Sequence, residues 1–372
     1  MRVGGPAEEI LTAHTRQELT EEAIRLWERG DDWLLLGGGS NTIVADEGYP
    51  GPVLLVRTSG LSVIDDPELG PGAVRLRVEA GHDWDALVAE CVERGWAGIE
   101  ALSGIPGMAG AAPVQNIGAY GQELSDVLHS IEFLDASTYE PRRMQAAELE
   151  LSYRDSVIKQ GLEGVVLSID IVLSDAGVGV GEAGPEPMSE PIAYSQLAGA
   201  LAVELGARVP LRTVRETVLR LRASKGMVLD EADHDSWSAG SFFTNPIVTE
   251  RFARGLPENA PRFPVAETGP TAAVTTFEEL AAGQPLRVPA TPPERRVKLS
   301  AAWLIEQSGV PRGYRLPGSG ASVSTKHTLA ITNRGGASAS DVGELARFIV
   351  QRVQQEFGLV LVPEPNLYGI EL

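Results

Sequence analysis

Cysteine, histidine and lysine are scarce in this chain of 372 residues. The single cysteine, Cys91, excludes an intrachain disulfide bond and a metal site built from several cysteines. It lies at helical spacing from Trp84, Leu87 and Val88, so we expect it to fill space in a core. The five histidines are scattered without the spacing of metal ligands, and we predict no metal site.

Long apolar runs are also missing. The N-terminus has no apolar segment typical of a secretory signal. The longest uncharged stretch, residues 101–122, is long enough to span a membrane, but it contains Pro106, Pro113 and several glycines. A membrane core requires an unbroken hydrogen-bonded helix, so this stretch is not a span. We expect a soluble, cytoplasmic protein without membrane insertion.

Positive charge is in deficit, because 31 Lys and Arg residues face 51 Asp and Glu residues and leave a net charge of −20. A chain this acidic repels nucleic acid and anionic lipid at long range, so neither is an expected partner. Hydrophobic residues at 43% and charged residues at 22% exclude collagen-like, coiled-coil and wholly disordered chains. The length favours more than one domain, because a single core stops growing near ~250–300 residues. The only lysines are Lys159, Lys225, Lys298 and Lys326.

Helix signals are clear in the first hundred residues. Thr15 and Glu18 fit a capping box, an apolar 3.6-residue period follows, and Gly30 can end the helix. A second helix is expected over residues 84–94, ended by Gly95. We also expect strands at 33–36, 131–134, 165–173 and 359–362, and helices at 195–205, 213–224 (opened by a capping box at Thr213) and 340–357. The irregular order of these elements favours an α+β protein over a doubly wound sheet.

Residues 179–184 match the pattern G-x-G-x-x-G of dinucleotide-binding proteins. That fingerprint must open a helix, whereas Pro185, Pro187 and Pro191 follow here. Glu182 would also place negative charge beside a phosphate. We interpret residues 174–191 as a linker or loop, and residues 257–293 as a second stretch of low order.

Two glycine-rich loops are better candidates for a ligand site. Three successive glycines at 37–39 follow a predicted strand, and their N–H groups can turn inward to bind an anion. A tight turn without a ligand remains the alternative. Residues 103–121 are uncharged and mostly small, so their backbone can pack against a flat apolar ligand, with Gln115 and Asn116 available to its ring heteroatoms. A buried packing loop is the alternative there.

These loops resemble the flavin-binding half of the UDP-N-acetylenolpyruvoylglucosamine reductase (MurB) family. Later motifs resemble the same family in the same order over nearly the whole chain: Leu-Ser-Tyr-Arg-Asp-Ser at 151–156, Ala-Gly-Ser-Phe-Phe-Thr-Asn-Pro at 239–246, Lys-Leu-Ser-Ala-Ala-Trp-Leu-Ile at 298–305 and Val-Pro-Glu at 362–364. The resemblance implies an α+β fold, with an FAD-binding domain of two α+β subdomains (the PCMH-type flavoprotein fold) and a C-terminal α+β substrate-binding domain. The expected boundaries are 1–173, a linker with a tyrosine loop at 174–212, the substrate domain at 213–357, and a strand at 358–372 that returns to the flavin domain.

The resemblance also implies an activity. Such an enzyme is an oxidoreductase in which noncovalent FAD takes a hydride from NADPH and reduces UDP-N-acetylglucosamine enolpyruvate to UDP-N-acetylmuramate, in peptidoglycan precursor synthesis. The family's catalytic residues correspond to Arg154, to Ser241 as proton donor and to Glu364. We further expect a monomer.

The chemistry of these residues suits their implied roles. A guanidinium such as that of Arg154 can bind a carboxylate in two places and keeps its charge, although an ion pair with Asp155 is the plainer alternative. Glu364, if buried near a second carboxylate, should have a raised pKa; an exposed terminal charge is its alternative. Ser241 has no histidine or aspartate partner in its motif and does not lie in a G-x-S-x-G turn, so it is no hydrolase nucleophile.

The remaining site residues follow from the same resemblance. Tyr194, Lys225 and Asn245 correspond to contacts of the substrate diphosphate, with Tyr194 on a mobile loop that marks one subtype. The cofactor-binding residues are expected to be Gly37, Gly38, Gly39, Ser40, Asn41, Ser103, Gly104, Ile105, Pro106, Gly107, Gly110, Ala111, Gln115, Asn116, Gly118, Tyr120 and Tyr153.

Some features depart from the family pattern. Phe263 stands where related enzymes can carry a tyrosine, and the stretches 226–238 and 268–293 are longer than expected. The resemblance begins at Met1, so we expect the natural chain to start upstream.

Two other functions remain open: a flavin oxidase or dehydrogenase of the same fold with another substrate, and a non-catalytic regulator that binds a UDP-sugar.

Overall fold

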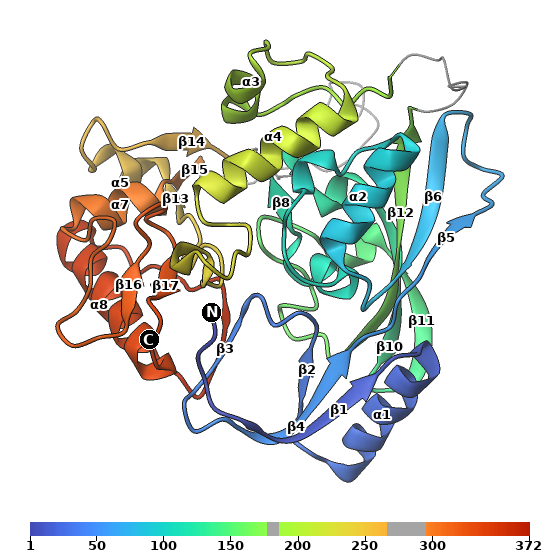
Figure 1. Cartoon of the computed structure of the whole chain (residues 1–372), viewed down its shortest axis with the longest axis horizontal. Helices are drawn as coiled ribbons and strands as arrows, with labels where there is room; N and C mark the ends of the chain where they lie inside the picture. The colour runs from blue at the N-terminus through green and yellow to red at the C-terminus, as the bar shows by residue number, and fades with distance from the viewer. Residues whose placement is uncertain (177–185, 266–294) are drawn as a thin grey trace, which may run out of the picture.

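The computed structural model describes residues 1–176, 186–265 and 295–372, and its mixed helices and strands confirm the predicted α+β class (Figure 1). The strands are β1 (Ala7–Ala13), β2 (Leu34–Leu36), β3 (Thr42–Val44), β4 (Tyr49–Val56), β5 (Leu61–Ile64), β6 (Ala73–Glu79), β7 (Trp96–Ala97), β8 (Gly118–Ala119), β9 (Gln122–Glu123), β10 (Leu128–Asp135), β11 (Glu140–Gln145), β12 (Gly164–Asp175), β13 (Ile247–Thr249), β14 (Arg262–Pro264), β15 (Arg296–Leu299), β16 (Ala321–Val323), β17 (Ile331–Asn333) and β18 (Asn366–Tyr368). The helices are α1 (Arg16–Arg29), α2 (Trp84–Arg94), α3 (Ser195–Leu201), α4 (Leu211–Ser224), α5 (Glu250–Arg254), α7 (Ala301–Gln307) and α8 (Ala339–Phe357), with short 3-10 helices η1 (Glu100–Leu102), η2 (Ala109–Gln115), η3 (Leu124–Asp126), η4 (Ala146–Leu149) and η5 (His234–Ser236).

The first layer is a small parallel sheet of order β1-β4-β2 with α1 beside it (Figure 1). The helix begins and ends as predicted, because Thr15 accepts the N–H of Glu18 and Gly30 adopts a left-handed φ of 68°. Its buried face presents Leu19 and Leu26 to a core shared with β4 and β12. Each such leucine stabilises the fold by about 1.5–3 kcal/mol.

A larger antiparallel sheet of order β11-β10-β12-β6-β5 forms the second layer, with β7 paired to β12. Its core packs against α2, which contributes Trp84, Leu87, Val88 and the buried Cys91. Burial raises the pKa of the Cys91 thiol to about 12, so the thiol stays protonated and inert, as expected for a core residue.

The C-terminal lobe contains α5, α7, α8 and the strands β13 to β17, coloured orange to red in Figure 1. The chain then returns, because β18 pairs in parallel with β3 and places Asn366 opposite Thr42. Ile43 of β3 is buried in the core of this lobe. The segment that follows the first glycine loop is therefore held by the C-terminal lobe.

Helices α3 and α4 lie across the top of the molecule in Figure 1, next to α2 and η1. Val214 and Val218 of α4 pack with Ala101 and with Leu197 of α3. The predicted boundary at residue 213 would assign α4 to the C-terminal domain, whereas Val214 and Val218 pack against residues that precede this boundary.

Three predicted elements differ from the structure. The helix expected at 195–205 ends at Leu201, where Ala202 adopts the left-handed conformation. Helix α4 begins at Leu211 after Pro210 and has no side-chain cap, so the capping box predicted at Thr213 is wrong. Residues 359–362 are not a strand, although Leu361 is buried while Val360 and Val362 are more than half exposed. The Val362 carbonyl oxygen accepts the N–H of Thr244, but the contact continues only as an isolated bridge between Phe243 and Pro363, and the last strand is β18. An alternating pattern becomes a strand only where a neighbouring strand can satisfy its hydrogen bonds.

The G-x-G-x-x-G match at 179–184 and the whole of the long stretch 268–293 lie outside the described residues. The stretch 226–238 is described, and its Asp235 is buried, where it accepts hydrogen bonds from Ser324 and Thr325. In the three described ranges, no helix combines the length and the apolar character that a membrane crossing requires.

One contact across the two halves yields a test of stability. Asp46 accepts the N–H groups of Ala339 at 2.6 Å and Ser340 at 2.9 Å, at the start of α8. Burial works to raise the pKa of Asp46, but these N–H groups hold it below its ordinary value. We predict that Asp46→Ala lowers the free energy of unfolding by about 1 kcal/mol at neutral pH, measured by urea unfolding.

The difference in the free energy of unfolding between the variant and the wild type should disappear as the pH falls through the folded-state pKa of Asp46. The wild-type carboxylate is then protonated and no longer carries the charge that stabilises this contact. The neighbouring Glu47→Gln variant is the control and should unfold like the wild type. An Asp46→Ala effect that persists unchanged in acid would contradict the assignment.

Candidate active site

A cavity of about 430 Å³ lies between the two glycine loops and the C-terminal strand. Its size falls in the range of ordinary ligand pockets. Segments spread over most of the chain contribute the lining residues: Leu35, Leu36, Gly37, Gly38, Gly39, Ser40, Asn41, Thr42 and Val56; Ala80 and Trp84; Ile105, Pro106, Gly107, Met108, Gly110, Ala111, Ala112, Val114, Gln115, Ile117 and Gly118; Arg154, Ile158, Lys159, Gly164 and Val166; Arg222, Met227, Ala239, Gly240 and Ser241; and Glu364 and Asn366.

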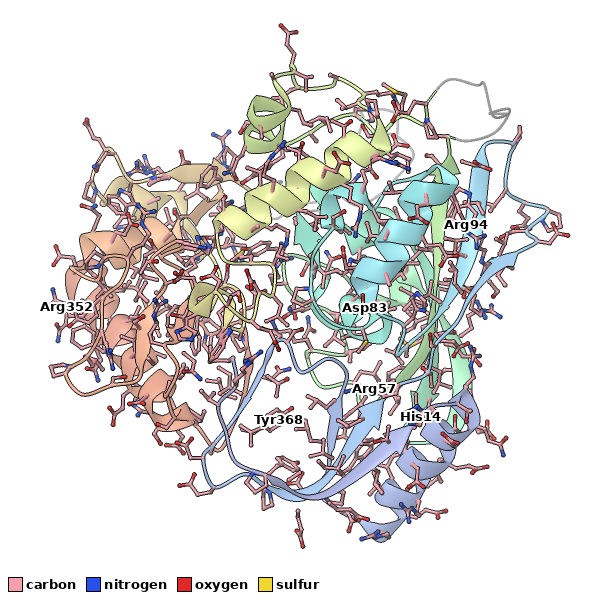
Figure 2. All side chains as sticks on the ribbon, in the orientation of Figure 1. His14, Arg57, Asp83, Arg94, Arg352 and Tyr368 are labelled. Carbon is pink, nitrogen blue, oxygen red and sulfur yellow. The ribbon has the colours of Figure 1, made fainter. Side chains whose placement is uncertain are left out.

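The two glycine loops approach each other so closely that side chains are excluded. A Cβ atom on Gly38 would lie 3.0 Å from the Cα of Gly107. Arg57, labelled in Figure 2, supports the first loop by donating from Nη1 to the carbonyl oxygen of Gly37 at 2.9 Å. Such a backbone cradle beside apolar walls fits a flat cofactor with a phosphate group.

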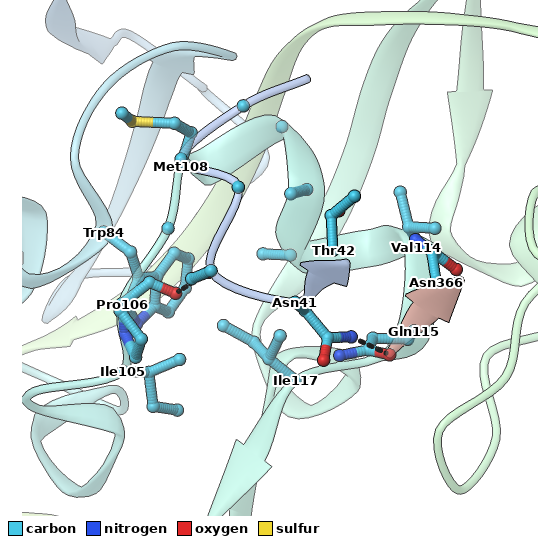
Figure 3. A pocket seen from close by; sticks show the side chains of 18 of the residues that line it. Asn41, Thr42, Trp84, Ile105, Pro106, Met108, Val114, Gln115, Ile117 and Asn366 are labelled. Atoms are coloured by element: carbon cyan, nitrogen blue, oxygen red, sulfur yellow. Dashed lines mark hydrogen bonds between the residues drawn. The ribbon is translucent and has the colours of Figure 1, made fainter. Parts of the chain in front are cut away.

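Side-chain contacts also join the loops. Asn41 Nδ2 donates to Gln115 Oε1 at 3.2 Å, and the hydroxyl of Ser40 donates to the carbonyl oxygen of Pro106 at 3.1 Å (Figure 3). Asn41 Nδ2 also reaches the carbonyl oxygen of Glu364 at 3.2 Å. The cavity wall is therefore tied to the returning C-terminal segment.

Arg154 and Glu364 form an ion pair at the cavity. The distance from Arg154 Nε to Glu364 Oε1 is 3.3 Å, and the two side chains are 19% and 16% exposed. Burial raises the pKa of Glu364, while Arg154 and, less strongly, Lys159 oppose the rise. The plainer alternatives of a surface pair with Asp155 and an exposed terminal charge do not fit this geometry.

The Arg154 backbone adopts a left-handed φ of 57°, which is unfavourable for a residue with a side chain. Its guanidinium donates to the carbonyl oxygens of Asn116 at 3.0 Å and Gly118 at 2.7 Å. Lys159 Nζ in turn donates to the carbonyl oxygen of Arg154 at 2.8 Å. These bonds hold the guanidinium in one direction despite the backbone cost.

Ser241 lines the cavity at the start of a buried segment. Phe242 N–H donates to the carbonyl oxygen of Leu329 at 2.7 Å, and the carbonyl oxygen of Phe242 accepts the N–H of Glu364 at 2.9 Å. Ser241 and Glu364, more than a hundred residues apart in sequence, therefore reach the cavity from adjoining backbone.

Lys225 lies in a second cluster outside the cavity lining. Its Nζ donates to Gln196 Oε1 at 2.9 Å and lies 5.4 Å from the ring centroid of Tyr120. Tyr194 contacts the Tyr120 ring edge-on at 5.9 Å between centroids and is 44% exposed. Burial, and then the charge of Arg222, lowers the pKa of Lys225. A cation in this setting favours an anionic ligand.

Asn245 lies in a third cluster, around Tyr153. Asn245 Nδ2 is 3.4 Å from the Tyr153 hydroxyl, and its Oδ1 accepts the N–H of Ala301 at 2.9 Å. Lys298 Nζ lies 4.5 Å from the centroid of the Tyr153 ring. Phe263 is half exposed and pairs with Lys298 across β14 and β15.

The structure brings most, but not all, of the predicted residues into the cavity. Arg154, Ser241 and Glu364 line it together with most of the predicted cofactor residues. The residues outside its lining are Ser103, Gly104, Asn116, Tyr120, Tyr153, Tyr194, Lys225 and Asn245.

Sequence reasoning missed two cations of the cavity wall, Lys159 and Arg222. Lys159 is one of only four lysines, which was a usable signal. Arg222 lies in the last turn of α4, three residues before Lys225, and its buried Nε has no hydrogen-bond partner in the part of the chain that the structure describes. Among the same residues, no cluster of His, Cys, Asp and Glu could hold a metal ion.

Comparisons with known proteins agree along the whole chain. A family model described as UDP-N-acetylenolpyruvoylglucosamine reductase, C-terminal domain, matches residues 231–368, and one described as FAD binding domain matches residues 7–138. The UDP-N-acetylenolpyruvoylglucosamine reductase of Leifsonia xyli subsp. xyli is 55% identical over 100% of this chain and 97% of that protein. That of Saccharopolyspora erythraea is 45% identical over 100% of this chain and 93% of that protein.

Solved structures give the same result. The crystal structure of UDP-N-acetylenolpyruvylglucosamine reductase (MurB) from Thermus caldophilus is similar with a TM-score of 0.58 at 25% sequence identity. The similarity covers 98% of this chain and 94% of that chain, so it includes both halves of the fold.

The ion pair in the cavity gives a pH prediction. Replacing Arg154 by Met removes the strongest influence that opposes the effect of burial, so the pKa of Glu364 should rise further above its ordinary value. Carboxyl ¹³C chemical shifts, followed against pH, measure this directly. Lys159→Met should produce a smaller rise, and a fall of the Glu364 pKa in Arg154→Met would refute the pairing.

Proposed function

Because the chain belongs to the UDP-N-acetylenolpyruvoylglucosamine reductase family, we propose that it reduces the enolpyruvyl ether of UDP-N-acetylglucosamine to UDP-N-acetylmuramate, as a step of peptidoglycan precursor synthesis. It is an oxidoreductase with an FAD-binding domain, and NADPH is the proposed hydride donor. The observation that best supports the proposal is the meeting of Arg154, Ser241 and Glu364 in one cavity with the glycine loops.

The glycine loops are suited to hold the flavin noncovalently. The cradle of Gly37, Gly38 and Gly39 offers backbone N–H groups to the cofactor's phosphates, and the apolar residues Ile105, Pro106 and Ile117 offer a wall to a ring system. Bound FAD would supply the hydride that reduces the vinyl carbon of the substrate. The cavity wall presents no histidine or cysteine within the described residues, which supports noncovalent attachment.

Arg154 and Glu364 are proposed to bind the substrate's carboxylate end. Reduction of the vinyl group drives negative charge onto that carboxylate, and a guanidinium already fixed by two carbonyl oxygens can stabilise the charge without reorganising. Glu364 would repel the substrate if ionised, so its raised pKa and its pairing with Arg154 both favour binding.

Ser241 is proposed to donate the proton to the carbon next to the reduced one. A serine is a weak acid, but the intermediate that it protonates is strongly basic, so the transfer can be favourable. The position of Ser241 on the cavity wall, with its backbone fixed next to Glu364, supports this role.

The substrate's diphosphate is proposed to bind outside the flavin cavity. Lys225, Tyr194 and Tyr120 form one partly exposed cluster, where the cation can meet phosphate charge. Asn245 is a further proposed contact, through its amide nitrogen, which lies 3.4 Å from the Tyr153 hydroxyl. Tyr194 precedes α3 on the proposed mobile loop of the tyrosine-bearing subtype.

The same proposal includes three further predictions: the domain boundaries, a monomeric state and a cytoplasmic location. If the chain were a flavin enzyme of the same fold with another substrate, the purified protein would contain yellow flavin, but its oxidation of NADPH would not respond to UDP-N-acetylglucosamine enolpyruvate. A regulator without catalysis predicts a colourless protein that binds a UDP-sugar.

The assay of choice is oxidation of NADPH, followed by its absorbance, with and without UDP-N-acetylglucosamine enolpyruvate. Oxidation that rises with the substrate, in a protein with bound flavin, is the expected result. A yellow protein whose NADPH oxidation does not respond to the substrate would refute the proposal in favour of the oxidase alternative.

Replacing Ser241 separates the two halves of the reaction. Ser241→Ala should leave reduction of the bound flavin by NADPH intact and should slow re-oxidation by the substrate by several orders of magnitude, on the order of 10³-fold or more, because only that step needs the proton. Stopped-flow flavin absorbance measures both steps. Ser62→Ala, an exposed position on β5, is the control, and equal slowing of both steps would refute the role.

A further inference from the structure

The N-terminal end of α2 holds the second glycine loop by several hydrogen bonds. The indole Nε1 of Trp84 donates to the carbonyl oxygen of Leu102 at 3.3 Å, and the Trp84 backbone N–H donates to the carbonyl oxygen of Gly107 at 3.0 Å. Between these two points, Asp85 Oδ1 accepts the N–H of Gly104 at 2.6 Å. One carboxylate therefore fixes the middle of a turn that continues into the cavity wall.

Asp85 is itself held by Arg215 of α4. Nη1 of the arginine lies 2.6 Å from Oδ1 and Nη2 lies 2.8 Å from Oδ2, and the two side chains are 16% (Arg215) and 35% (Asp85) exposed. A bidentate charged pair of this kind fixes the direction of both groups. Burial raises the pKa of Asp85, but Arg215 and the N–H of Gly104 outweigh it and hold the pKa below its ordinary value. The carboxylate is therefore ionised at neutral pH.

Helix α4 also packs directly on the turn. Gly104 has a left-handed φ of 72°, and a Cβ atom there would lie 2.9 Å from Leu219 Cδ2 and 3.3 Å from Arg222 Nε. A side chain at this position would force the Leu219 and Arg222 side chains to shift, and the left-handed backbone itself favours glycine. Figure 1 shows α4 crossing above α2 at this place.

The same helix carries the cations of both proposed ligand sites. Arg222 lines the flavin cavity, and Lys225, which follows the last residue of α4, lies in the cluster proposed to bind the substrate diphosphate. The contact between α4 and the glycine loop therefore also fixes the positions of these two charged side chains.

We propose that Asp85 and Arg215 are positioning residues, which fix the Gly104 turn for flavin binding and brace it against α4. Neither side chain lines the cavity, so both act through the backbone of the turn. A ligand site needs such support, because displacements below 1 Å in a contacting loop weaken binding. The role of Lys225 in binding the substrate rests on the proposed function. The role of Asp85 and Arg215 in flavin binding rests only on the presence of the FAD-binding domain.

Release of FAD from the purified holoenzyme on dilution, followed by the gain in flavin fluorescence, tests the proposal. Asp85→Ala and Arg215→Met should each release FAD at least about tenfold faster than the wild type, which corresponds to about 1.4 kcal/mol. The double variant should be no faster than the faster single variant, because both substitutions break one bridge. Asp85→Asn keeps an oxygen that can accept the N–H of Gly104, so its release rate should lie between those of Asp85→Ala and the wild type.

Two controls separate positioning from general stability. Glu90→Gln breaks an exposed pair with Arg94 on the same helix and should leave release unchanged. Asp46→Ala weakens the contact at the start of α8, and because Asp46 does not line the cavity this variant should also leave release unchanged. All rates are compared at a temperature well below the melting temperature of each variant.

Release within twofold of the wild-type rate in either single variant would overturn the proposal. A double variant whose effect equals the product of the single effects would also overturn it, because the two residues would then act independently. The measurement needs no substrate, so a holoenzyme that fails to reduce UDP-N-acetylglucosamine enolpyruvate would refute the proposed function and leave the result on Asp85 and Arg215 standing.

Discussion

The site depends on the contact of Arg154 with Glu364, two residues that lie far apart in the sequence. A carboxylate that is mostly buried must be paired or protonated, and here the guanidinium lies 3.3 Å away. The backbone of Glu364 carries two further constraints, since its N–H bonds to Phe242, next to Ser241, and its carbonyl oxygen accepts from Asn41 of the first glycine loop. One residue thus brings together the flavin loop, the proposed proton donor and the proposed carboxylate site. The pairing of β18 with β3 immediately afterwards holds this residue in place.

The net charge of −20 opposes the approach of anions, and the arrangement of cations resolves this conflict with a site for anionic ligands. Arg154, Lys159 and Arg222 all line the same cavity, and Lys225 lies just beyond it. Within a partly dry cavity, the Coulomb interaction with a bound phosphate or carboxylate greatly exceeds that with acidic side chains in solvent, which salt and water screen. The acidic surface therefore disfavours extended polyanions and leaves small anionic ligands free to bind. The lowered pKa values of Arg222 and Lys225 reflect burial first, and a bound anion would relieve that cost.

Local signals in the sequence predicted local structure well, and contacts between distant segments were the limit. The capping box at Thr15 and the ending glycines at Gly30 and Gly95 all appear as expected, because each needs only a few neighbouring residues. The similar box at Thr213 failed because Pro210, with its fixed φ, already starts the helix two residues earlier. The glycine loops could be recognised by composition, whereas the place of Arg222 in the cavity wall could not, since the fold alone brings α4 onto Gly104. The partner of Glu364 came from family resemblance, and no spacing rule would have found it.

Left-handed backbone occurs at Arg154, which lines the cavity, and at two residues of the second glycine loop. Arg154, Asn116 and Tyr120 all have positive φ values, of 57°, 43° and 49°, although none is glycine. Each such residue costs of order 1 kcal/mol, and glycine would remove that cost. Glycine would also remove the guanidinium of Arg154 and the amide of Asn116, which bonds to Glu123, Ser125 and the backbone of Ser152. The strain is therefore the consequence of placing specific side chains where the chain must turn sharply. The strain persists because surrounding hydrogen bonds hold the backbone in this conformation. One of these bonds runs from Lys159 to the carbonyl oxygen of Arg154.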